Sequence, residues 1–149
     1  AFEWIIQINL IGTFRCIAMS AAGMMTLDPQ EDGDRGAIVN TASVAAEDGQ
    51  IGQVAYAAAK SGIHGFTKSL AMEGARFGVT ANAIAPGYIA TEMLATIPDN
   101  VMEKIVAQIP IGRLGQADEI ARGVEFLTSE NAGFITGSTL SINGGQHMY

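Results

Sequence analysis

The stretch "VTANAIAPG", from Val79 to Gly87, is a run of small and apolar residues closed by proline and glycine. A short apolar run bounded by such breakers indicates a buried strand of a parallel sheet. The earlier run "AIVNTAS", from Ala37 to Ser43, ends in small polar residues, as expected of a buried strand that stops at a site. A third strand is predicted in "GSTLSINGG", from Gly137 to Gly145.

Helical patterns separate these strands. Apolar residues recur at helical spacing from Phe2 to Met25 and from about Gln53 to Arg76, and Gly78 lies just beyond the second helix as a stop. Two shorter helices are predicted over residues 99–108 and 116–128, each after a turn that contains proline or glycine. This order of elements is that of an α/β layer with a parallel sheet.

No repeat or linker divides residues 1–149, so we expect a single domain. Its 48% hydrophobic and 15% charged residues exclude a disordered chain. The net charge of -7 argues against nucleic acid as a partner, because phosphate binding needs a basic face. The loop Thr26–Gly36 holds four acids, a proline and two glycines, and is expected to be exposed; its "EDGD" turn lacks the calcium-loop pattern.

The single cysteine, Cys16, cannot form an internal disulfide and lies in an apolar helical pattern. We therefore expect a buried structural thiol and a reducing compartment. The apolar start is interrupted by Glu3, Gln7 and Asn9, unlike a signal peptide, and we expect it to fall short of the ~20 residues of a membrane span. These features predict a cytoplasmic protein with no membrane partner.

Metal binding is not expected, because the two histidines, His64 and His147, lie far apart in sequence and have no ligand partners at metal spacing. We interpret both as surface or core residues.

Tyr56 lies four residues before Lys60, so on a helix their side chains point into a common space. A phenol titrates near ~10 in water, and a cation about 4 to 5 Å away should lower that pKa by roughly two units. Tyr56 could then act as a general acid or base. Taken alone, the pair is more simply explained as a core aromatic residue beside a solvated lysine.

Ser43 changes this balance, because it ends a predicted strand thirteen positions before Tyr56. Ligands of open α/β sheets bind at the carboxyl ends of the strands. Ser43 could polarise a carbonyl group, Tyr56 could supply the proton, and Lys60 could tune Tyr56. A carbonyl reduction needs these roles together with a hydride donor that side chains cannot provide.

Five motifs resemble the short-chain dehydrogenase/reductase family over essentially the whole chain. They are Ser43, the segment Tyr56–Lys60, "NLIGTF" at Asn9–Phe14, "PGYIAT" at Pro86–Thr91, and "SINGG" at Ser141–Gly145. The resemblance implies a Rossmann-like doubly wound parallel sheet, of which residues 1–149 would form the carboxyl-terminal catalytic part.

The resemblance also implies a catalytic tetrad, which consists of Asn9, Ser43, Tyr56 and Lys60. Within it, Asn9 would hold a water that relays protons to Lys60, and Lys60 would also bind the nicotinamide ribose. Asn9, Tyr56 and Lys60 thus count as cofactor-binding residues as well. Without the resemblance, an Asn inside a helix is more simply explained as solvated or bonded to a nearby backbone group.

"PGYIAT" follows a predicted strand, where Pro86 and Gly87 allow close backbone approach and Ile89 can offer its main-chain groups to a planar amide. The resemblance implies that these residues bind the nicotinamide carboxamide and that Thr91 lies near the pyrophosphate. The alternative is a simple Pro-Gly turn. The next segment, "EMLATIPDN" at residues 92–100, resembles the family's mobile substrate lid.

Several segments resemble the branches of the family that act on 3-oxoacyl or 3-hydroxyacyl thioesters. They are "GQIGQVAY", "NGGQHMY", "DRGAIVNTASVAAEDGQIGQVAY" and "IPIGRLGQADEIA". The expected substrate is therefore an acetoacetyl-CoA-like thioester, a substrate of fatty acid metabolism. The implied pocket combines residues from both halves of the site: Ser43, Gln50, Ile51, Gln53, Tyr56, Gly87 and Tyr88. Another ketone or secondary alcohol, such as a steroid, stays open as the alternative.

The family's glycine-rich turn for the pyrophosphate does not occur in residues 1–149, and only three strands are visible. We therefore expect a truncated enzyme whose choice between NAD and NADP lies outside this sequence, with NADPH favoured. A non-catalytic fragment that persists by helix-mediated association is the alternative.

The resemblance also implies dimerisation through the helix that carries Tyr56. Its small-residue face, Ala55, Ala58, Gly62 and Gly65, permits close helix packing. We expect a homo-oligomer, a dimer or tetramer, for the full-length protein. The alternative is that this face packs on the chain's own sheet, and both can occur together.

Overall fold

Three parallel strands form one sheet in the order β1 (Gly36–Thr41), β2 (Val79–Pro86) and β3 (Thr139–Ile142). The computed structural model describes all residues 1–149. All three predicted strands are confirmed. Their register pairs Thr41 with Ile84 and Pro86 with Ile142, so the carboxyl ends of the three strands lie at one edge of the sheet.

The central strand β2 is the most deeply buried element, with seven of its eight residues buried. It has a strand on each side and helices on both faces, which explains why its sequence is continuous in small and apolar residues. Its one amide side chain is satisfied, because Asn82 Nδ2 donates to the Ile135 carbonyl and Asn82 Oδ1 accepts from the Ser138 amide.

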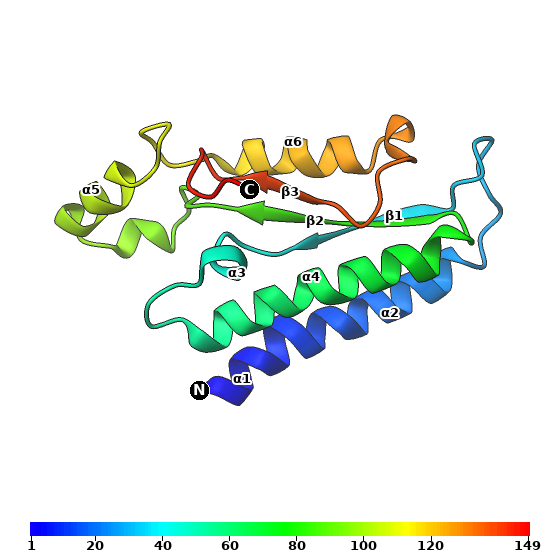
Figure 1. Cartoon of the computed structure of the whole chain (residues 1–149), viewed down its shortest axis with the longest axis horizontal. Helices are drawn as coiled ribbons and strands as arrows, with labels where there is room; N and C mark the ends of the chain where they lie inside the picture. The colour runs from blue at the N-terminus through cyan, green and yellow to red at the C-terminus, as the bar shows by residue number, and fades with distance from the viewer.

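Two long helices lie side by side on one face of the sheet (Figure 1). The first is continuous through α1 (Phe2–Ile6), the π-helical turn η1 (Gln7–Gly12) and α2 (Thr13–Met24), and the second is α4 (Val54–Ala75). Both predicted helices are confirmed. Together with β1 and β2 they enclose the main core cluster, which consists of Ile17, Ala21, Ile38, Ala71, Val79 and Ala81.

The expectation of a buried Cys16 is wrong, because this side chain is exposed. The core stripe of α2 runs through Ile17 and Ala21, and Cys16 lies one position away, about 100° around the helix axis.

The length expected for the first apolar segment is also wrong. Its polar residues do not interrupt the helix, and Phe2–Met24 is 23 residues long and apolar enough to cross a membrane by length and composition alone. Only 11% of its most apolar window is buried inside the chain, and Ile17 and Ala21 are the residues of α2 that pack into the core. Large apolar side chains on the outer side of the helix, among them Trp4 and Met19, are exposed.

Helix α4 turns a stripe of mostly small residues toward the core. Its buried residues are Ala55, Ala59, Ile63, Thr67, Ala71 and Gly74, whereas Tyr56 and Lys60 are half-buried. Gly62 packs against the first helix, because an added Cβ would lie 2.7 Å from Leu10 Cδ1, while nothing lies within 4 Å of an added Cβ at Gly65. Part of the small-residue face is therefore used within the chain.

Helix α6 (Ala117–Leu127) covers the opposite face of the sheet and contacts all three strands. Helix α5 (Asp99–Ala107) and the turn η2 (Leu94–Thr96) extend beyond the carboxyl edge of the sheet, and neither has a buried residue. Helices α5 and α6 were both predicted from the sequence. Short α3 (Ala45–Asp48) and η3 (Glu130–Ala132) were not, since four and three residues are too few for a periodic pattern.

Candidate active site

Ser43 lies two residues beyond β1, where the strand pairing continues past the strand itself. The Ala42 amide donates to the Ile84 carbonyl at 2.8 Å, and the Val44 amide donates to the Pro86 carbonyl at 3.0 Å. These bonds hold Ser43 beside the end of β2. Ser43 Oγ accepts a hydrogen bond from the Ala45 amide at 3.2 Å, so its hydroxyl proton is free to donate to a ligand.

Tyr56 and Lys60 lie one turn apart near the start of α4 and on the same side of it. Lys60 Nζ donates to the Thr41 carbonyl at 2.8 Å and lies 5.6 Å from the centre of the Tyr56 ring. Burial lowers the pKa of Lys60. The ammonium therefore ties the end of β1 to α4, and Ser43, Tyr56 and Lys60 gather at the carboxyl edge of the sheet.

Asn9 lies in the π-helical turn η1, which packs against α4. Its Nδ2 donates to the Ile5 carbonyl at 3.2 Å, and its own carbonyl accepts from Thr13 Oγ1 at 2.9 Å. The amide nitrogen thus bonds to nearby backbone, whereas Oδ1 has no hydrogen bond within the chain. Single π-turns inside α-helices are frequent at functional sites.

The segment Pro86–Thr91 leaves the sheet close against the turn that follows β3. The Gly87 amide donates to the Ile142 carbonyl at 3.0 Å, and an added Cβ at Gly87 would lie only 2.9 Å from Asn143 Cα. Gly87 is therefore needed for this close backbone approach.

Ile89 forms an isolated parallel bridge with Gly115. The Gly115 amide donates to the Tyr88 carbonyl at 2.9 Å, and the Ala90 amide donates to the Gly115 carbonyl at 2.8 Å. In a parallel bridge of this pattern the amide and carbonyl of Ile89 itself point away from Gly115, and neither bonds within the chain. One free donor and one free acceptor, side by side, fit a planar carboxamide such as that of nicotinamide.

The expected substrate residues are only partly brought together. Gln50 Nε2 donates to the Tyr88 hydroxyl at 3.2 Å, which links the loop before α4 to the segment after β2. Gln53 is the N-cap residue of α4, and Ile51 is fully exposed without a contact of this kind. Thr91 is exposed, just before the segment 92–100.

The two histidines are far apart in sequence, but both contact acidic residues of α3. His64 Nε2 lies 3.1 Å from Glu47 Oε1, and His147 Nδ1 lies 2.8 Å from Asp48 Oδ1.

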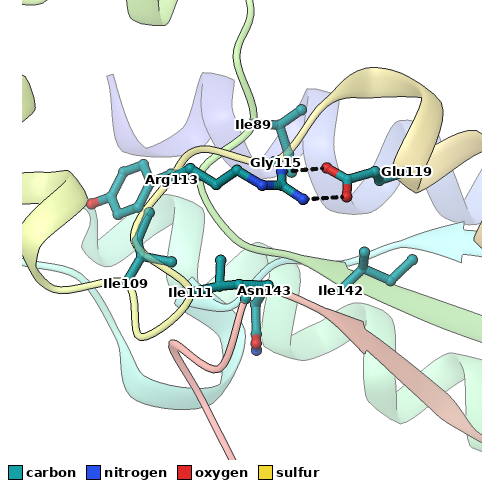
Figure 2. Close-up of a pocket in the computed structure, with 10 residues that line it drawn as sticks. Ile89, Ile109, Ile111, Arg113, Gly115, Glu119, Ile142 and Asn143 are labelled. Atoms are coloured by element: carbon teal, nitrogen blue, oxygen red, sulfur yellow. Dashed lines mark hydrogen bonds and ion pairs between the residues drawn. The ribbon is translucent and has the colours of Figure 1, made fainter.

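The structure contains an ion pair between Arg113 and Glu119 that was not predicted from the sequence. Both guanidinium nitrogens Nη1 and Nη2 donate to the Glu119 carboxylate at 2.8 Å (Figure 2). Glu119 Oε2 also accepts from the Gln116 amide at 2.8 Å, which completes a capping box for α6. The guanidinium of Arg113 is the main cause that lowers the pKa of Glu119 to about 2. The capping-box spacing from Gln116 to Glu119 was the available signal.

Comparisons with known proteins show which proteins this chain resembles. A family profile described as "Enoyl-(Acyl carrier protein) reductase" matches residues 1–147. Acetoacetyl-CoA reductase of Shinella zoogloeoides is 54% identical over 147 residues, which cover 97% of this chain and 58% of that protein. The reductase of 3-oxoacyl-[acyl-carrier-protein], FabG, of Escherichia coli (strain K12) is 46% identical over 148 residues, which cover 98% of this chain and 58% of that protein.

A solved structure of 3-hydroxyacyl-CoA dehydrogenase type-2 from Mycobacterium avium superposes with a TM-score of 0.93 at 38% identity. The match covers 99% of this chain and 57% of that one. The chain therefore spans less than three fifths of the length of the relatives that it matches.

Proposed function

Since this chain belongs to the short-chain dehydrogenase/reductase family, we propose that its protein is an oxidoreductase that interconverts 3-oxoacyl and 3-hydroxyacyl thioesters. Its parallel sheet with helices on both faces is the corresponding part of the family's Rossmann-like fold. The observation that carries the proposal is the position of Lys60, whose ammonium lies over the Tyr56 ring and contacts the Thr41 carbonyl at the end of β1, two residues before Ser43.

The proposed chemistry uses the hydroxyl groups of Ser43 and Tyr56, which have a proton available to donate to a ligand. The Ser43 hydroxyl donates to the substrate carbonyl oxygen and polarises it, and the Tyr56 hydroxyl delivers the proton to the same oxygen. The Lys60 ammonium stabilises the negative charge that develops on the phenol during this transfer. In the reverse direction Tyr56 takes the proton from the 3-hydroxyl group.

A nicotinamide dinucleotide, when bound, supplies the hydride for the carbonyl carbon. The free amide and carbonyl of Ile89 would hold its carboxamide, with Pro86 and Gly87 allowing close approach, while Lys60 would bind the ribose. Asn9 would contribute its free Oδ1 to an ordered water, and Thr91 would lie near the pyrophosphate. We propose NADPH as the reduced cofactor, because the similar relatives are named as reductases.

An acyl thioester of the acetoacetyl-CoA type is the proposed substrate. Its support is the names of the relatives and the contact between Gln50 and Tyr88, which joins two of the expected substrate residues. Ile51, Gln53 and Gly87 would line the rest. We further propose a cytoplasmic homo-oligomer, a dimer or tetramer.

One observation favours a second candidate. Residues 1–149 contain no glycine-rich turn of the GxGxxG kind, so this chain by itself would hold the cofactor only at its nicotinamide end. A role as a non-catalytic chain that associates through its helices is the corresponding alternative.

A fusion protein separates the two candidates. The part of the Shinella zoogloeoides reductase that this chain does not match is joined to residue 1, and NADPH or NADH oxidation is measured with acetoacetyl-CoA, longer 3-oxoacyl thioesters and a steroid ketone. We expect turnover of the thioesters, abolished by Tyr56→Phe. A folded fusion protein that binds NADPH and turns over none of these thioesters would exclude the proposed activity, and turnover of the steroid alone would reassign the substrate.

A further inference from the structure

The segment that carries Ile89 is held on one side by backbone bonds alone. The Gly115 amide donates to the Tyr88 carbonyl, and the Ala90 amide donates to the Gly115 carbonyl. An added Cβ at Gly115 would lie 2.6 Å from Ile89 Cδ1, so the two segments are already as close as a glycine allows. The direction of the free Ile89 amide and carbonyl therefore depends on where Gly115 lies.

The turn containing Gly115 is in turn fixed by charged side chains on each side of it. Before Gly115, the Arg113 guanidinium binds the Glu119 carboxylate through two bonds and the Leu114 carbonyl through a third at 3.0 Å. After Gly115, the Gln116 amide binds the same carboxylate. Figure 2 shows this ion pair spanning the turn at Gly115, with Ile89 beside it.

One side of the turn at Gly115 borders a cavity, so packing constrains its position less on that side. Arg113, Gly115, Glu119 and Ile89 line a cavity of about 100 Å³. Three isoleucines, Ile109, Ile111 and Ile142, line it together with Tyr88, Asn143 and Gly144. A turn that borders a cavity has fewer packed neighbours to resist a shift than one seated on a filled core. Outside the bridge, the ion pair joins the residues on both sides of Gly115 and so constrains its position.

We propose that the Arg113–Glu119 ion pair is a positioning device that holds the Ile89 main chain in the direction needed to bind a nicotinamide carboxamide. This inference rests on the proposed function for its ligand, while the coupling between the ion pair and Ile89 is a property of the chain itself. Neither Arg113 nor Glu119 touches the cofactor or substrate, so both act through Gly115.

The exposure of the pair distinguishes positioning from stabilisation. The side chains of Arg113 and Glu119 are 51% and 30% exposed, and exposed ion pairs contribute little to folding stability. A bidentate guanidinium–carboxylate pair does, however, fix orientation strongly. Loss of the pair should change the local geometry and cofactor binding much more than the melting temperature.

Glu119→Gln tests this directly, because glutamine removes the charge yet can still accept the Gln116 amide in a capping box. Asp118→Asn is the matched control, since Asp118 is an acid of the same helical turn whose side chain makes no hydrogen bond in this structure. The first readout is hydrogen exchange of the Ala90 and Gly115 amides in the chain of 149 residues. We expect both to exchange about 10-fold faster in Glu119→Gln, with β2 amides unchanged.

The second readout is NADPH binding and steady-state kinetics in the fusion protein. We expect the Kd and KM for NADPH to rise about 10-fold in Glu119→Gln, while KM for the thioester is unchanged and Asp118→Asn behaves like the parent. Unchanged exchange at Ala90 and Gly115, or unchanged NADPH affinity, would overturn the inference. If the parent fusion protein turns over no substrate, the proposed function fails, and exchange and NADPH binding still decide the inference.

Discussion

Two parts of the candidate site are held in place by different means. Tyr56 and Lys60 lie on a helix whose neighbouring residues Ala59 and Ile63 are completely buried against the sheet. The segment that carries Ile89 is joined to Gly115 by a two-bond bridge, a partly exposed ion pair spans the turn at Gly115, and the helix α5 between them has no buried residue. The proton-transfer groups are thus fixed by the core, whereas the cofactor-facing backbone is fixed by polar contacts that can be altered without unfolding the chain.

The largest effect is expected where the core holds the chemistry. Tyr56→Phe removes only the phenol oxygen, which makes no hydrogen bond within the chain, so the fold should be unchanged. We expect kcat of the fusion protein with acetoacetyl-CoA to fall about 10²–10⁴-fold, as for loss of a general acid. A fall of less than tenfold, with a native melting curve, would remove Tyr56 from the proton transfer.

Substitutions in the two regions should change the free energy of unfolding by different amounts. Ile63→Ala empties a completely buried site on α4 and should lower the free energy of unfolding by about 2–5 kcal/mol. Val101→Ala on α5, where the side chain is 42% exposed, should change it by less than about 0.5 kcal/mol. Urea unfolding of the chain measures both. Equal losses would mean that α5 belongs to the same packed core.

The pH dependence of stability should report the burial of Lys60. Burial lowers its pKa below the ordinary 10.5, so the folded chain binds this proton more weakly than the unfolded chain. The resulting cost is present below the folded-state pKa and is relieved as pH rises toward 10.5. Relative to Lys60→Met, the parent chain should therefore gain stability with rising alkaline pH in urea titrations. A constant difference between parent and variant would contradict this burial.

The smallest effect on folding stability is expected at Glu119, because its ion pair is at the surface. Its folded-state pKa of about 2 lies below the ordinary 4.5, so its contribution is present above pH 4.5 and is lost as pH falls through about 2. Carbon-detected NMR titration of the Glu119 carboxyl group should give this low midpoint, and Arg113→Met should move it back up. A midpoint near 4.5 in the parent would mean that the bidentate pair does not form in solution.

The sequence predicted the parts of this comparison that depend on burial. Strand β2 and helix α4 were identified because apolar runs and 3.6-residue periodicity follow directly from packing on a sheet. Periodicity did not fix which side of a helix is buried, as the exposed Cys16 illustrates.

Contacts between distant segments left no periodic signal. The free main-chain groups of Ile89 follow from a bridge to Gly115, 26 positions away, and no local pattern encodes that pairing. The π-turn at Asn9 is a local departure from a regular helix that residue composition does not mark. Ser43, Tyr56 and Lys60 could be proposed only because their motif is short and tied to predicted elements.

A double-mutant cycle of Ser43→Ala and Tyr56→Phe in the fusion protein tests most directly whether the two hydroxyl groups serve one substrate oxygen. Groups that act as a unit lose their effect together, so we predict that kcat of the double variant falls within about threefold of the slower single variant. If the two losses instead multiply, Ser43 and Tyr56 act independently, and the shared carbonyl site at the carboxyl edge of the sheet is wrong.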